Sequence, residues 1–172
     1  MATKEPVPSP SERVSASYKQ LFAAAAGLNT VSDALGKSIS ALDNALKKLN
    51  LGISTWVKVK EWHDQSGEWY SNHKLGYAKI GNKWGIGLAT EEGSYNYPDD
   101  EKSEAWLFNE APRSLRIEAV EKIPDLLAQL TKETETTTQK LAAKVSEAEE
   151  LADTINQVVS ELNPPKKPGG PR

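Results

Sequence analysis

The amino-acid sequence predicts an α+β fold: a long antiparallel helical hairpin, forming a coiled-coil-like stalk, with a small antiparallel β-meander inserted at its closed end. Two segments near the ends of the chain carry apolar residues at alternating spacings of three and four, the repeat of a helix that packs along another helix. The two segments match in length, and nearly all of the aromatic residues lie between them. No comparable pattern identifies a biochemical activity.

The first stalk helix is expected at residues 11–50, with Ser11 as its N-cap and Gly52 as its stop signal. It is a rod of about 58 Å. Residues 1–10 are rich in proline and predict a disordered N-terminal segment. The seam that only a partner helix can cover consists of Val14, Tyr18, Leu21, Ala25, Leu28, Ser32, Leu35, Ile39, Leu42, Leu46 and Leu49.

The second stalk helix is expected at residues 113–162, with a kink at Pro124, because proline removes a backbone donor and crowds the preceding turn. The part that follows Pro124 matches the first helix in length, so the predicted hairpin places Leu28 near Leu141. Residues 163–172 predict a disordered tail rich in proline and basic residues. The second seam consists of Val120, Ile123, Leu127, Leu130, Thr134, Thr137, Leu141, Lys144, Ala148, Leu151, Ile155, Val158 and Leu162.

Residues 53–112 predict the β-sheet head. The dipeptide Gly81-Asn82 indicates a two-residue hairpin turn, and residues 115–130 offer the nearest apolar cover for the inner face of the sheet. Trp56 and Trp62 are placed to lie over the glycines of a neighbouring strand. Strands are expected at residues 53–62, 75–80, 83–90 and 105–108.

Ten of the twelve aromatic residues, including all five tryptophans, lie between Trp56 and Phe108. Two interpretations of this concentration stay open. The aromatic residues fill the core of a small sheet, or some of them form a ligand-binding surface built from Trp62, Trp69 and Tyr70, with Tyr95 and Tyr97 as further candidates, because aromatic faces stack on sugars and bases.

No catalytic residue, metal site or cofactor is predicted. The chain has no cysteine, which excludes disulfides and thiolate chemistry. If the first two strands are neighbours, His63 and His73 converge with Asp64, but two histidines in a polar loop are far more often solvent-exposed than metal-bound. No nucleophile motif occurs, so we do not expect an enzyme.

The charge and hydropathy patterns limit the classes of partner. The formal net charge is −3 and no segment is a basic stripe, so we expect no nucleic-acid partner. Neither a membrane span nor a secretory signal is visible, and the expected location is cytoplasmic.

The stalk also carries apolar residues beside its seams. Val145, Ala152 and Val159 follow one another at heptad spacing next to the second seam, and Phe22 lies next to the first. A two-helix hairpin has nothing to cover this wider stripe, which favours a homodimer.

Two functions of different classes remain open. The first is a non-enzymatic scaffold or protein–protein interaction protein, whose helical stalk self-associates and whose sheet head or stalk docks a partner. The alternative is a small ligand- or carbohydrate-binding module that uses the aromatic head. A concave pocket lined by Trp62, Trp69 and Tyr70 would favour the alternative, and a flat head would favour the scaffold.

Overall fold

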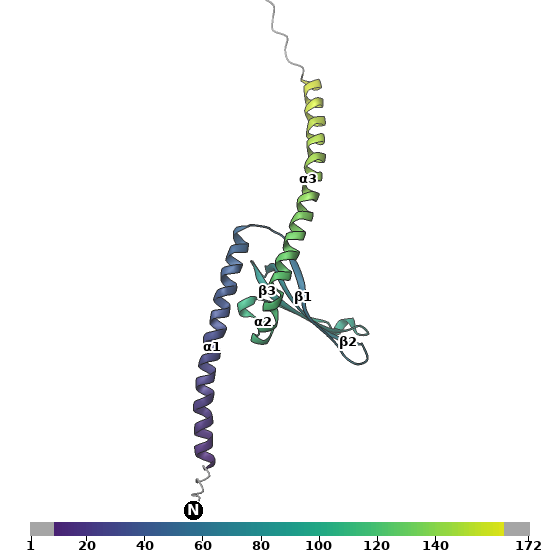
Figure 1. Ribbon diagram of the computed structural model, residues 1–172. Helices are drawn as coiled ribbons and strands as arrows, with labels where there is room; N and C mark the ends of the chain where they lie inside the picture. The colour runs from purple at the N-terminus through teal and green to yellow at the C-terminus, as the bar shows by residue number, and fades with distance from the viewer. Residues whose placement is uncertain (1–8, 164–172) are drawn as a thin grey trace, which may run out of the picture.

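The computed structural model describes residues 9–163, which fold as a four-stranded antiparallel sheet with two long helices and one short helix (Figure 1). Helix α1 spans Pro10–Lys48, and its N-cap is Ser9 rather than the predicted Ser11. The Ser9 hydroxyl accepts a hydrogen bond from the Glu12 N–H at 3.3 Å, and the Glu12 carboxylate accepts one from the Ser9 N–H at 2.7 Å. This capping box satisfies two donors that a helix start leaves free, so the helix begins earlier than predicted.

The sheet is the predicted meander, with strand order β1-β2-β3-β4. Gly81 has a φ of 59° in the two-residue turn that joins β2 to β3, which confirms the predicted hairpin. Strands β2 and β3 are longer than expected, because their polar ends continue to pair with each other beyond the buried part of the sheet. The strands are β1 (Thr55–His63), β2 (Trp69–Ile80), β3 (Lys83–Ser94) and β4 (Lys102–Leu107).

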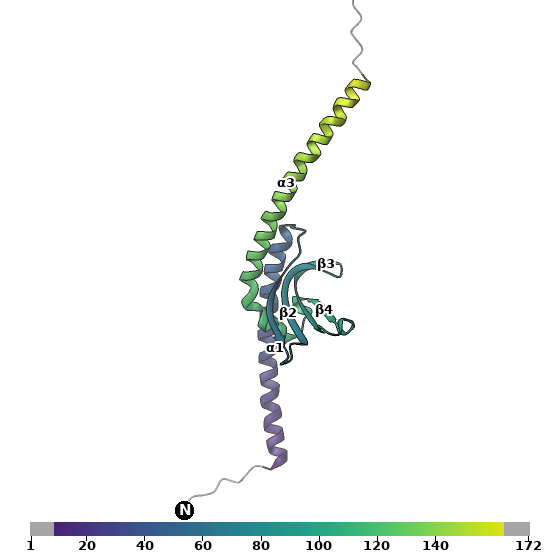
Figure 2. The ribbon, with the colours of Figure 1, turned by 90° about the vertical axis from the view of Figure 1, so that its right-hand side faces the viewer.

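One face of the sheet is covered by helices over part of its length (Figure 2). The large apolar residues of the sheet that are buried on this face are Leu75, Tyr77, Ile86 and Leu88. The helices contribute Ile39 and Leu46 from α1, Leu115 and Ala119 from α2 (Arg113–Ala119), and Leu126 and Leu130 from α3 (Ile123–Leu162). Segments from both ends of the chain therefore share one core, and the predicted cover from residues 115–130 is confirmed. We call this unit, the sheet with α2 and the packed parts of α1 and α3, the head.

The opposite face of the sheet is shielded by side chains lying over glycines. A Cβ atom on Gly76 would lie 2.3 Å from the ring of Trp56, and one on Gly87 would lie 2.1 Å from Ile80. Trp56 therefore occupies the place that the sequence predicts for it. Trp62 does not, because its cross-strand partner is Ser71 and its side chain lies on the helix-covered face.

The predicted kink at Pro124 is a complete break. Helix α2 ends at Ala119, the 3₁₀ turn Val120–Lys122 follows, and Pro124 lies in the first turn of α3, where its missing N–H is no loss. Helix α2 is tied to α1 by hydrogen bonds from Arg113 to Asn29 (3.0 Å) and from Arg116 to the Ser32 hydroxyl (3.2 Å).

The predicted antiparallel hairpin is not confirmed, because α1 and α3 leave the head at opposite ends of the molecule (Figures 1 and 2). Residues 10–31 of α1, here called the first arm, and residues 138–162 of α3, the second arm, are exposed throughout. Leu28 and Leu141, which the prediction placed together, are 50% and 61% exposed. The head-proximal parts of both seams pack on the sheet, so the sheet, rather than a partner helix, sets the two helix directions.

The predicted disordered segments, residues 1–10 and 163–172, lie outside the described residues except for Ser9, Pro10 and Asn163. Disorder at the two ends therefore stays a prediction. Within residues 9–163, no helix combines the length and the apolar character that crossing a bilayer requires.

Candidate functional site

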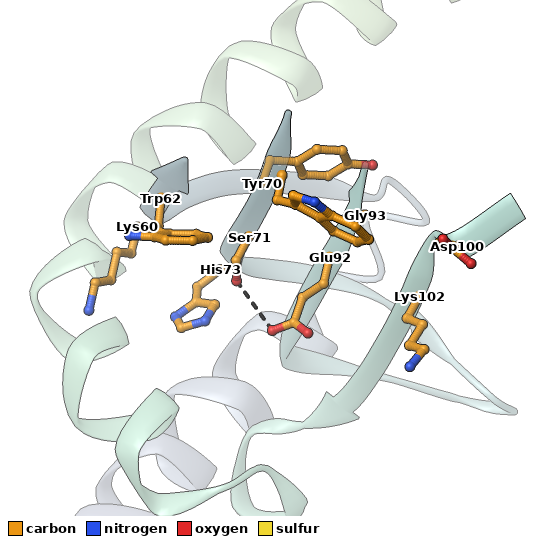
Figure 3. Close-up of a pocket in the computed structure, with 10 residues that line it drawn as sticks. Lys60, Trp62, Tyr70, Ser71, His73, Glu92, Gly93, Asp100 and Lys102 are labelled. Carbon is orange, nitrogen blue, oxygen red and sulfur yellow. Dashed lines mark hydrogen bonds between the residues drawn. The ribbon is translucent and has the colours of Figure 1, made fainter. Parts of the chain in front are cut away.

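A cleft opens where the sheet extends past the helices that cover it. Its floor is a row of side chains that crosses all four strands: Trp62 on β1, Ser71 on β2, Glu92 on β3 and Lys102 on β4 are successive cross-strand partners. The Ser71 hydroxyl donates a hydrogen bond to the Glu92 carboxylate at 3.3 Å. Figure 3 shows Trp62, His73 and Glu92 converging on the same space. We call this space the aromatic cleft.

Two exposed tryptophans line the aromatic cleft. Trp62 and Trp69 are 54% and 42% exposed, although large apolar side chains in this head are otherwise mostly covered. The volume of the cleft is about 710 Å³, within the range of small-molecule sites. Its lining consists of Lys60, Trp62, Trp69, Tyr70, Ser71, His73, Glu92, Gly93, Asp100 and Lys102.

Helix α2 holds one edge of the aromatic cleft through Glu118. The Glu118 carboxylate lies 3.1 Å from Nδ1 of His73 and 3.3 Å from the ammonium of Lys60. The hydrogen bond with His73, followed by that with Lys60, holds the pKa of Glu118 below its usual value. These contacts fix His73 and Lys60 at the junction between the covered sheet and the open cleft.

The predicted binding set of Trp62, Trp69 and Tyr70 is divided between the two faces of the sheet. All three residues line the aromatic cleft, so the concave pocket that would favour a ligand-binding head is present. The hydroxyl of Tyr70, however, lies 2.9 Å from where a Cβ atom of Gly93 would be, and its ring lies 4.9 Å from that of Tyr95. Tyr70 therefore covers the opposite face and contributes to the rim.

The two histidines do not come together. His63 pairs with Tyr70 across the strands, whereas His73 pairs with Lys60, and these two pairs lie on opposite faces of the sheet. Among residues 9–163, no three residues of the types that ligate metals form a group able to hold an ion. His73 instead lines the aromatic cleft, a role that its position in the sequence did not indicate.

Sequence reasoning missed Glu92, Lys102 and Glu118 as partners of the tryptophans. The first two belong to a segment rich in acidic residues, which reads as a solvated loop, and Glu118 lies on a helix far along the chain. Their proximity depends on strand register and on how α2 docks. The only signal for the cleft in the sequence was the clustering of aromatic residues on β1 and β2.

The two arms form a second candidate surface. The residues predicted to form an oligomer interface lie on them: Phe22 is 69% exposed on the first arm, and Val145 and Val159 are 54% and 51% exposed on the second, where Ala152 is also exposed. They continue seams whose other large apolar members on the arms are also exposed: Val14, Tyr18, Leu21, Leu28, Leu141, Leu151, Ile155, Val158 and Leu162.

Comparison with known proteins identifies neither surface. No protein-family model, no curated protein and no solved structure matches this chain. The aromatic cleft and the exposed arms are therefore the features of the structure that bear on function.

Proposed function

We propose that this protein is a non-enzymatic scaffold that self-associates through its two helical arms. The observation that supports the proposal is the length of apolar seam that folding leaves uncovered on both arms. A heptad seam is the surface of a helix that packs on another helix, and contiguous exposed apolar surface on a soluble chain marks an interaction site. The coiled-coil pairing that the sequence predicts within one chain is thus proposed between copies.

The position of the head restricts how two copies fit together. Leu21 on the first arm and the buried Ile39 are separated by about five complete helical turns, so both face the same side of α1. Ala148 on the second arm has the same relation to the buried Leu130 of α3. Each seam therefore faces the side on which the head lies. A copy aligned along the whole molecule would collide with the head, whereas a copy displaced along the axis meets only an arm.

The charges favour pairing of a first arm with a second arm. The first arm has two basic residues and one acidic residue, Arg13, Lys19 and Glu12. The second arm has two lysines against five acidic residues, so two second arms repel each other. We therefore propose that the first arm of one copy packs on the second arm of the next. The smallest such assembly is the homodimer, and its two free arms allow further copies to add, because head-to-tail contacts do not close by themselves.

The first test is the mass of the protein in solution as a function of concentration. Light scattering should show an apparent mass above that of one chain that rises with concentration. The double substitution Val145→Lys and Val159→Lys should return the protein to a monomer, because it places charge in the apolar stripe beside the seam. The matched control, Ser146→Lys and Ser160→Lys, adds the same charge one residue further on, away from the seam, and should leave association almost intact. A wild type that is monomeric at the highest concentration, or a control that dissociates equally, would contradict the proposal.

The second test identifies which arms pair. Because the chain has no cysteine, single cysteines report contacts without background. Leu21→Cys and Leu151→Cys variants, mixed and oxidised, should form a disulfide mainly between the two different variants. Predominant dimers of Leu21→Cys with itself, or of Leu151→Cys with itself, would show pairing of like arms and would refute the pairing of unlike arms.

A further inference from the structure

We propose that the aromatic cleft binds a neutral carbohydrate, a function separate from association through the arms. The first ground is the exposure of two indole rings, Trp62 at 54% and Trp69 at 42%, on one face of the sheet. An indole ring has a negative face and a large apolar area. It therefore attracts the polarised C–H bonds on the apolar face of a sugar ring. Trp56, by contrast, is packed against Gly76 on the other face.

The second ground is the polar lining between the rings. Ser71 and Glu92 are hydrogen-bonded to each other at 3.3 Å on the floor of the cleft, and His73 points into the same space (Figure 3). The Glu92 carboxylate accepts hydrogen bonds, as does the Ser71 oxygen, whose proton is donated to Glu92, and the Lys102 ammonium in the lining donates them. Sugar hydroxyls need both kinds of partner. A few polar groups fixed among aromatic side chains are typical of a site that orients a small ligand.

The third ground is the balance of charge in the cleft. The lining contains two lysines, Lys60 and Lys102, and two carboxylates, Glu92 and Asp100. A phosphate or carboxylate ligand would meet Glu92 on the floor, and an ammonium ligand would meet the lysines. A neutral ligand avoids both repulsions. The chemistry of the lining therefore favours a neutral polyhydroxylated ligand over an anion or a cation.

The cleft is also built on rigid structure. The four residues of its floor lie in paired strands, and Glu118 of α2 holds His73 and Lys60 at its edge. Little ordering is required of the protein when a ligand enters, which favours affinity.

Calorimetric titration of the full-length protein tests the proposal. The probes are neutral oligosaccharides of glucose, galactose, mannose and N-acetylglucosamine, each raised to about 10 mM because single-site sugar binding of millimolar strength is measurable. At least one should bind. Trp62→Ala and Trp69→Ala should each weaken its binding by about tenfold or more, the effect of removing one stacking face. Tyr97→Ala, which removes an aromatic ring that is 58% exposed outside the cleft, should leave binding unchanged.

Several results would overturn the proposal. They are the absence of binding by every neutral sugar, affinity that both tryptophan variants retain, and binding only by nucleosides or by charged saccharides used as comparison probes. Glu92→Gln provides a milder variant if either tryptophan variant fails to fold, as judged by circular dichroism. It keeps the shape of the floor and should weaken sugar binding because a neutral amide accepts hydrogen bonds less strongly than a carboxylate.

Discussion

The two halves of α1 have the same apolar spacing, but seam residues are buried in only one of them. In the half that adjoins the sheet, Ile39 and Leu46 of the seam are 3% and 8% exposed, while in the first arm Leu21 and Val14 of the same seam are 65% and 69% exposed. Helix propensity and apolar spacing do not separate the halves. What separates them is that β3 and α2 lie beside one half, whereas the first arm meets α2 at its head-proximal end, where Arg113 donates a hydrogen bond to Asn29, and the side chains of that arm are exposed. A heptad seam thus specifies that a helix needs cover without specifying what covers it.

The same division applies to α3. Leu130 of its seam is 3% exposed in the head and Leu126, beside the seam, is fully buried, whereas Leu151 and Ile155 of the seam are 66% and 63% exposed on the second arm. In the head, the core side chains are buried by contacts within one chain. The apolar side chains of the arms are exposed, and we propose that another copy covers them.

The largest expected effect comes from removing the helices from the head altogether. Residues 53–112 expressed alone should be unfolded, because the buried sheet residues Leu75 and Leu88 lose the cover that α1, α2 and α3 provide. The measurement is the dispersion of amide signals in an NMR spectrum. A well-dispersed spectrum would show that the sheet is independently stable and that the helices are not part of its core.

A matched pair of leucine substitutions in α1 sharpens the comparison. Leu46→Ala should lower the free energy of unfolding by about 2–4 kcal/mol, because it leaves a cavity in the head. Leu21→Ala should change that free energy by less than about 0.5 kcal/mol at a concentration where the protein is monomeric. Urea unfolding followed by circular dichroism measures both. Equal destabilisation would mean that the first arm is covered within the chain.

A second pair compares glycines. Gly76→Ala should destabilise the protein by about 1–3 kcal/mol, because the new methyl group would overlap the ring of Trp56. Gly27→Ala on the first arm meets no atom within 4 Å, so alanine should stabilise the helix by about 0.5–1 kcal/mol. Melting temperatures should shift in opposite directions. A loss of stability in Gly27→Ala would reveal a packing contact on the arm.

The smallest expected effect concerns the ion pairs of Glu118. Its pKa is lowered in the folded protein, so its contribution to stability is present above the usual glutamate value and is lost as the pH falls through the lower folded value. In Glu118→Gln the free energy of unfolding should therefore fall less steeply than in the wild type between about pH 5 and pH 3. At neutral pH the two should differ by less than about 1 kcal/mol.

Glu149→Gln, on the second arm, is the control for that measurement. Denaturant unfolding across this pH range should give a wild-type slope for the control. An unchanged slope in Glu118→Gln would show that the contacts with His73 and Lys60 do not contribute to stability.

The sequence by itself determined the local elements. The spacing of apolar residues located both long helices, Gly81-Asn82 located the hairpin turn, and the meander order followed from short connections. Pro124 indicated an interruption, and the clustered tryptophans indicated the region of the aromatic cleft. Each of these depends on interactions between residues close in the chain, which a single sequence displays directly.

Only the tertiary structure decided how these elements combine. Register and sheet twist determine that Trp62 and Trp69 share a face with Glu92 while Tyr70 covers the other. The tertiary structure also determined what covers the head-proximal seam residues. Ile39, Leu46 and Leu130 pack in the core under the sheet instead of against a partner helix. Leu75 and Leu88 share one core with residues of α1 and α3 on one face of the sheet, and the two arms leave that core in opposite directions (Figure 1).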